Sequence, residues 1–185
     1  SFQISLAVDD IFLNSKINCD ILNDQAIFTS YIDRNLDLLI NIWKNKIYPK
    51  NKNKKLLITP IKENYENYNI FNREFGDKKK LLRDLICSRV FLIPGHKAEL
   101  FCIAAEEARE LCVPIVTLGI GSLKERVLHN KTGFIAKNYD EFADYATALF
   151  NDDKLWFSIR KNLFDLRGTK IWKNIAIEFL KKAYD

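Results

Sequence analysis

Residues 89–117 read RVFLIPGHKAELFCIAAEEARELCVPIVT, and this stretch decides the fold. Two short apolar runs, Arg89–Ile93 and Pro114–Thr117, enclose a helical pattern rich in Ala and Glu from about Glu99 to Leu111. Apolar runs of this length that alternate with helices are typical of a parallel sheet covered on both faces. We therefore predict a strand that ends at Pro94, a loop, a helix and a second strand.

The same alternation continues on both sides of this stretch. It predicts further strands at Ala26–Thr29, Leu56–Thr59 and Gly133–Ala136, and further helices at Leu36–Ile47, Lys80–Cys87, Asp140–Phe150, Asp153–Asp165 and Thr169–Tyr184. The predicted fold class is α/β, with a Rossmann-like parallel sheet flanked by helices. We expect residues 1–20 to be a linker-like segment leading into the domain, residues 21–168 to form the Rossmann-like domain, and residues 169–185 to be a C-terminal helix.

The composition is that of a globular chain. Of the 185 residues, 48% are hydrophobic and 29% are charged, which excludes a disordered chain, a collagen-like repeat and a disulfide-rich miniprotein. No apolar run approaches the roughly 18–20 residues of a membrane-spanning helix. The net charge of +5 comes from lysines without an arginine cluster or interleaved aromatic residues, so we predict no nucleic-acid partner. The lysine-rich segment Lys44–Lys55 is predicted to be a solvated loop.

The cysteines predict neither a zinc site nor a disulfide framework. Cys19, Cys87, Cys102 and Cys112 form no Cys-x-x-Cys pair, and no His lies near them at zinc spacing. We expect reduced, partly buried thiols in a cytosolic protein. Because the chain starts at Ser1 and contains no Met, we also expect it to be a piece from which an N-terminal part is missing.

Two carboxylates mark the candidate site. Ligands of open parallel sheets bind beyond the C-terminal ends of the strands, where helix N-termini also gather and favour anions. Glu99 and Glu107 would lie about 12 Å apart along one continuous helix. That spacing is too wide for paired-carboxylate hydrolysis of a glycosidic bond, and it suits two ends of an elongated ligand. Between them, the backbone amides of Phe101, Cys102 and Ile103 would face an anionic phosphate.

This stretch resembles the group 1 family of retaining glycosyltransferases, which have the GT-B fold. The family signature is a Glu, a Gly-Phe-Gly-like turn and a second Glu after seven intervening residues, as in Glu99–Glu107. Further similar motifs occur in the family order: Val8–Phe12, Thr29–Leu39, Cys112–Thr117, Gly119–Glu125 and Lys131–Ile135. The resemblance covers residues 8–185 and implies the C-terminal, donor-binding half of a GT-B enzyme, whose final helix reaches toward a missing N-terminal domain.

The resemblance also implies roles for individual residues. Glu107 would accept hydrogen bonds from the ribose hydroxyls of a nucleotide, and Glu99 would contact the transferred sugar. The amides of Phe101, Cys102 and Ile103 would bind the diphosphate, and Arg34 would neutralise it as it leaves. We assign catalytic roles to Glu99 and Arg34. The other donor-binding residues predicted from the resemblance are Glu107, Phe101, Cys102, Ile103, Gly95, His96, Gly119 and Gly121.

The chain departs from the family pattern at three positions. Leu100 and Cys102 replace the two glycines around Phe101, and Thr29 stands where family members often carry an Arg. One of two expected phosphate cations is therefore missing, although His96 and Lys97 lie in the same loop and are candidate substitutes. The base would lie in the irregular stretch Ile61–Asp77, where Tyr65 and Tyr68 offer rings for stacking.

The implied function is transfer of a sugar from a nucleoside diphosphate sugar, with retention, to a glycan or lipid-linked acceptor bound by the missing N-terminal domain. We expect no cofactor and no metal, because no Asp-x-Asp-type cluster ends a strand and Arg34 carries the phosphate charge. The expected setting is polysaccharide biosynthesis in the cytoplasm, with peripheral association of the full-length protein with the cytoplasmic membrane left open. The alternatives are a catalytically inactive GT-B-like binding or interaction module and a nucleotide-sugar epimerase domain.

Overall fold

A computed structural model describes residues 6–17, 24–169 and 171–184 of the chain. Its centre is one parallel six-stranded sheet with the strand order β3-β2-β1-β4-β5-β6. The strands are β1 (Gln25–Ile27), β2 (Lys55–Ile58), β3 (Ile70–Asn72), β4 (Val90–Leu92), β5 (Ile115–Thr117) and β6 (Gly133–Ile135). The predicted α/β class and the parallel sheet are confirmed.

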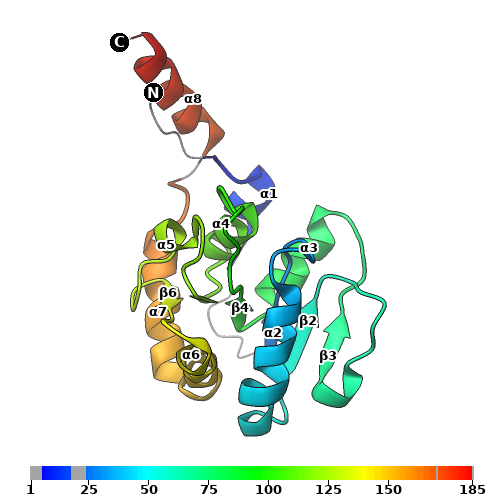
Figure 1. Cartoon of the computed structure of the whole chain (residues 1–185). Helices are drawn as coiled ribbons and strands as arrows, with labels where there is room; N and C mark the ends of the chain where they lie inside the picture. Colours follow the sequence, from blue (N-terminus) through cyan, green and yellow to red (C-terminus); the bar gives the residue numbers. More distant parts are fainter. Residues whose placement is uncertain (1–5, 18–23, 170, 185) are drawn as a thin grey trace.

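Helices cover both faces of this sheet (Figure 1). They are α1 (Asp10–Leu13), α2 (Leu36–Ile42), α3 (Lys78–Ile86), α4 (Ile103–Glu110), α5 (Leu123–Arg126), α6 (Tyr139–Asn151), α7 (Asp153–Asp165) and α8 (Trp172–Tyr184). Helix α6 packs on β4, β5 and β6, whereas α4 packs on β5 and contacts α1, α5 and α7. Three helices are capped at their N-termini by a side chain that accepts a hydrogen bond from an amide of the first turn. The capping residues are Asp77 for α3, Asn138 for α6 and Asp152 for α7.

The core explains why the central strands are apolar except at Thr117, which ends β5 and is itself buried. All three residues of β4 and all three of β5 are buried, since helices lie on both faces of the sheet. Two tryptophans in the helices are buried, and the indole N–H of each donates to a backbone carbonyl: Trp43 to Tyr68 at 2.8 Å and Trp156 to Arg89 at 2.7 Å. Burial of the large rings therefore leaves no indole N–H unsatisfied.

Several predicted boundaries differ from the structure. The helix expected from Glu99 begins at Ile103, because Cys102 has a left-handed backbone with φ of 60° and the preceding residues form a turn. The prediction that Glu99 and Glu107 lie on one continuous helix is therefore wrong. The lysine-rich segment Lys44–Lys55 is also not simply a loop.

That segment continues α2 as a π-helical turn (Trp43–Ile47) and a 3-10 turn (Tyr48–Lys50) before β2 begins. Within it Asn51 is buried, and its amide donates to Ile47 O and Thr147 Oγ1 at 2.9 Å each. Part of the segment therefore joins the core, and Lys54 is also buried, where it pairs with Asp24.

The described cysteines differ in their exposure. Cys87 is exposed, whereas Cys102 and Cys112 are buried. Cys19 lies outside the described residues, as do parts of the predicted leading segment.

The link between α7 and α8 is tied to the end of α1. Phe12 of α1 is fully buried, and Arg167 Nη2 donates to the carbonyls of Phe12, Leu13 and Ser15. Beyond this point α8 projects away from the sheet (Figure 1), with Trp172 exposed. Among the described residues, no helix has the length and apolar character needed to cross a membrane.

The strand order fixes where a ligand site is expected. The chain runs outward from β1 to β2 and β3, then returns and places β4 on the other side of β1. At such a switch point the loops after the two central strands diverge and leave a crevice at the C-terminal ends of the strands. Here those loops are the segments after Ile27 and after Leu92.

Candidate functional site

A cavity of about 1150 Å³ lies at this switch point. Its walls come from the loop after β1, the loop after β4, the start of α4 and the segments that follow β2 and β3. The lining includes Thr29, Arg34, Arg73, Phe75, Glu99, Leu100, Phe101, Cys102, Ile103 and Glu107. The structure thus brings together six of the predicted site residues: Arg34, Glu99, Phe101, Cys102, Ile103 and Glu107. The volume is slightly above the range of roughly 300–1,000 Å³ for sites that enclose a small molecule.

Arg34 and Glu99 meet across the switch point. Arg34 lies in the turn before α2, and its Nε is 3.6 Å from Glu99 Oε2, with the two side chains 23% and 14% exposed. Its Nη1 is 3.3 Å from Nδ1 of His96, which also accepts from the amide of Ala98 at 3.1 Å. Asn35 joins the two loops because its side-chain amide donates to the Gly95 carbonyl. A guanidinium is therefore held at the cavity wall, where an anionic ligand would meet it.

Glu99 also satisfies the backbone at the start of α4. Its Oε1 accepts a hydrogen bond of 3.0 Å from the amide of Cys102. The Cys102 amide therefore already has an acceptor in Glu99, and its predicted contact with a phosphate stays a prediction. Ile103 and Ala104 are the first two residues of α4, so their amides have no acceptor within the helix. The amides of Ile103 and Ala104, at the start of α4, are therefore available to bind an anion.

Glu107 lies one turn further along α4 and is half-buried at the cavity wall. Burial raises the pKa of this carboxyl from 4.5 to about 7, because the charged form loses its water. Lys78 and Arg73 nearby act in the opposite direction, whereas Asp9 raises the pKa further. Lys78 is itself paired with Asp9, so it only partly offsets the cost of a charge at Glu107.

The cavity lining does not include three of the glycines predicted to bind the donor: Gly95, Gly119 and Gly121. Gly121 has a φ of +68°, and a Cβ there would lie 2.4 Å from His96 O and 2.9 Å from Glu99 O. A side chain at this position would push the loop after β5 away from the loop after β4. Among the described residues the tight packing of backbone on backbone accounts for this glycine, while any contact with a ligand stays a prediction.

The residues that depart from the family pattern all lie at the cavity. Leu100 is 89% exposed at its rim. The thiol of Cys102 is buried, and burial together with the neighbouring Glu99 raises its pKa to about 12, so this thiol stays neutral. The hydroxyl of Thr29 is buried and has no hydrogen-bond partner among the described residues. An unsatisfied hydroxyl in a cavity wall is a group that a polar ligand can satisfy.

Two cavity residues escaped the sequence analysis. Arg73, which pairs with Asp84 at 3.0 Å, and the exposed Phe75 follow β3 and line the cavity. The predicted stacking residues Tyr65 and Tyr68 do not line it. They lie beneath Lys44, whose ammonium is 5.1 Å and 4.7 Å from the two ring centroids. The cavity therefore receives residues from the predicted base segment, Ile61–Asp77, but not its two tyrosines, and the position of a base stays a prediction.

The described residues do not gather His, Cys, Asp or Glu into a group of three or more that would hold a metal ion. The charged groups at the cavity are instead single side chains on separate elements. The polar groups that line the described cavity include the guanidinium groups of Arg34 and Arg73, the carboxylates of Asp33, Glu99 and Glu107, and several hydroxyls, beside the amides at the start of α4.

Comparison with known proteins identifies the family. Residues 50–163, more than half of the chain, match the model of the family described as Glycosyl transferases group 1. A comparison of the sequence with curated proteins finds no significant match.

Solved structures share the fold at low sequence identity. A mutant of S. aureus TarM, crystallised with fondaparinux, alpha-GlcNAc-glycerol and UDP, has a TM-score of 0.75 at 17% identity over 100% of this chain. Anabaena HepE with UDP and glucose has a TM-score of 0.70 at 14% identity over 88% of this chain. Sucrose-phosphate synthase from Thermosynechococcus elongatus has a TM-score of 0.68 at 14% identity over 97% of this chain. The chain spans only 39%, 48% and 49% of these proteins, respectively. These matches confirm the Rossmann-like fold.

Proposed function

Because the chain belongs to the group 1 family of glycosyltransferases, we propose that its cavity binds the nucleoside diphosphate sugar that donates the sugar in a transfer reaction. The observation that carries the proposal is the arrangement at the switch point. A cation, Arg34, a carboxylate, Glu99, and the amide end of α4 meet at one side of the cavity, and a second carboxylate, Glu107, lies one turn further along α4.

Each group suits one part of such a donor. A carboxylate accepts hydrogen bonds from the vicinal hydroxyls of a ribose, which assigns Glu107 to the nucleoside. Arg34 and the amides of Ile103 and Ala104 suit the diphosphate, because a guanidinium and a helix N-terminus both stabilise anions. Glu99 then faces the sugar hydroxyls. The HepE structure was solved with UDP and glucose, which supports a donor of this class.

The chemical role of the site follows from where charge develops. When the bond between the anomeric carbon and the diphosphate breaks, negative charge grows on the leaving phosphate oxygens. Arg34 would stabilise this charge, while the pairing of Arg34 with Glu99 sets where the guanidinium lies. We propose that the sugar is transferred with retention, without a metal, and to a glycan or lipid-linked acceptor held by another domain. We also propose a role in polysaccharide biosynthesis in the cytoplasm.

The base and the ribose would occupy the side of the cavity formed after β2 and β3. Phe75 offers an exposed ring there, and Arg73 lies close enough to lower the pKa of Glu107. A base that stacks on Phe75 would place its ribose near Glu107, since both residues line the same cavity.

A second candidate is a binding module that has lost activity. The exposed Leu100 at the cavity rim and Thr29 in place of a second cation favour it. Calorimetric titration of UDP, GDP and ADP into the 185-residue chain tests the donor site that the proposed function requires. The exposed Glu63→Gln is the control, and Glu107→Gln is the site variant. The proposal expects at least one nucleotide to bind the chain and the control equally, and the site variant more weakly. If all three nucleotides fail to bind, the proposed donor site is wrong.

A further inference from the structure

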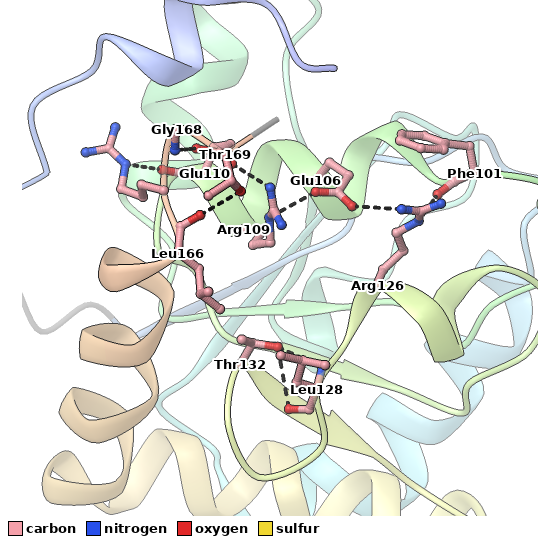
Figure 2. Close-up of polar contacts among 11 residues, drawn as sticks. Phe101, Glu106, Arg109, Glu110, Arg126, Leu128, Thr132, Leu166, Gly168 and Thr169 are labelled. Carbon is pink, nitrogen blue, oxygen red and sulfur yellow. Dashed lines mark hydrogen bonds and ion pairs between the residues drawn. The ribbon is translucent and has the colours of Figure 1, made fainter. Parts of the chain in front are cut away.

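Arg126, at the end of α5, packs against the turn that precedes α4 (Figure 2). Its guanidinium carbon lies 4.0 Å from the centroid of the Phe101 ring, and its Nε donates to the Phe101 carbonyl at 3.1 Å. Its Nη1 donates to Glu106 Oε1 at 3.3 Å. The side chain is only 9% exposed. One buried guanidinium thus contacts the ring and the carbonyl of the same cavity residue.

The opposite edge of the same peptide bond belongs to the site. The C=O and N–H of a trans peptide point in opposite directions. The carbonyl of Phe101 points to Arg126, and the N–H of Cys102 donates to Glu99 Oε1 at 3.0 Å. Glu99 in turn contacts Arg34 at 3.6 Å. A contiguous path of polar contacts therefore runs from Arg126 through one peptide plane to both residues assigned to the reacting end of the donor.

Glu106 holds Arg126 in this geometry. Its side chain is 3% exposed and lies between two arginines, at 3.3 Å from Arg126 and 2.9 Å from Arg109 (Figure 2). A buried carboxylate requires such partners, and it restricts their rotamers in return. The guanidinium is also stacked on the Phe101 ring, which adds a directional contact. Arg126 is therefore fixed on three sides.

We propose that Arg126 is a positioning residue: it orients the Phe101–Cys102 peptide and, through the Cys102 amide, the carboxylate of Glu99 at the sugar end of the cavity. This inference rests on the proposed function for the identity of the ligand, but the orientation itself concerns the chain alone. Without Arg126 the peptide can rotate, and Glu99 loses the donor that holds its Oε1.

The test uses two substitutions and a matched control. Arg126→Met removes the guanidinium, whereas Arg126→Lys keeps a charge opposite Glu106 but lacks the planar fork. Arg109→Met is the control, because Arg109 is similarly buried and pairs with the same Glu106 without contacting Phe101 in the described structure. Hydrogen exchange of the Cys102 amide is followed by NMR, with the amide of Ala108 inside α4 reporting on global opening.

The expected result is local. Exchange at Cys102 should accelerate about tenfold or more in both Arg126 variants and stay unchanged in Arg109→Met, with Ala108 alike in all variants that remain folded. Unchanged exchange at Cys102 in Arg126→Lys, in a protein whose Ala108 amide is still protected, would overturn the proposal.

A binding arm separates positioning from a merely structural role. With uridine, UDP and UDP-glucose as probes, Arg126→Lys should weaken the binding of UDP-glucose about tenfold more than the binding of uridine, since Glu99 serves the sugar end. Equal losses for all three probes would contradict the positioning role. If the unmodified chain binds none of them, the proposed function fails, and the exchange measurement still decides the orientation of the peptide.

Discussion

Glu107→Gln should stabilise this domain at alkaline pH while weakening its nucleotide binding. Burial raises the pKa of Glu107 from 4.5 to about 7, so between these pH values the folded chain holds a proton that the unfolded chain has lost. The stabilising contribution is complete below pH 4.5 and is lost as the pH rises through about 7. A shift of this size corresponds to about 3 kcal/mol of unfolding free energy, taken as an order of magnitude. Gln carries no such proton and escapes this loss.

The assay is urea unfolding of the chain and of Glu107→Gln at pH 5 and pH 8, with the exposed Glu63→Gln as control. From pH 5 to pH 8, the free energy of unfolding of Glu107→Gln should rise by about 2–3 kcal/mol relative to that of the unmodified chain, and that of the control should not change relative to it. Nucleoside diphosphate binding at pH 8 should weaken by about 1–3 kcal/mol, because a neutral amide replaces a charged acceptor. A stability difference that is equal at both pH values would refute the burial of this carboxyl.

Three further outcomes are expected. Arg34→Ala should weaken the binding of UDP by about 1–3 kcal/mol and leave the binding of uridine nearly unchanged, as measured by calorimetry. Equal losses of affinity for both ligands would mean that Arg34 supports the fold instead of binding the diphosphate. Gly121 and Gly168 share a φ near +68°, but a Cβ at Gly168 meets nothing within 4 Å. Gly121→Ala should therefore lower the denaturation midpoint more than Gly168→Ala does. Equal midpoints for the two variants would contradict the loop contact at Gly121. At pH 8 iodoacetamide should modify Cys87 rapidly and Cys102 hardly at all, as followed by mass spectrometry. The reason is that the Cys102 thiol, with a pKa of about 12, is only about 1 part in 10⁴ thiolate at this pH. Comparable rates for the two cysteines would show that the Cys102 thiol is accessible.

The elements that the sequence predicted well are those whose signal is long or strongly apolar. Helix α7 begins and ends at the predicted residues, Asp153 and Asp165, because a capping Asp precedes a helical pattern of several turns. The strand β4 is short but apolar at every position, and β5 departs from this pattern only at Thr117. By contrast, α1, α5 and β3 have only three or four residues, which is too short for periodicity to indicate them.

The site was predictable only where it depends on local sequence. Glu99, Glu107 and Arg34 all follow from local motifs that resemble those of the family. The contact of Arg126 with Phe101 joins residues 25 apart in the chain, and no periodicity encodes it. The left-handed backbone of Cys102 was also unforeseen, because a non-glycine residue rarely adopts it. That conformation sets the start of α4 and determines which amides remain available.

The most direct test of the donor site is a crystal structure of the chain with the nucleoside diphosphate that titrates most tightly. The account predicts ribose hydroxyls within about 3 Å of the Glu107 carboxylate. It also predicts phosphate oxygens at Arg34 and at the amides of Ile103 and Ala104. A nucleotide bound elsewhere on the chain, or in this cavity with its ribose away from Glu107, would contradict it.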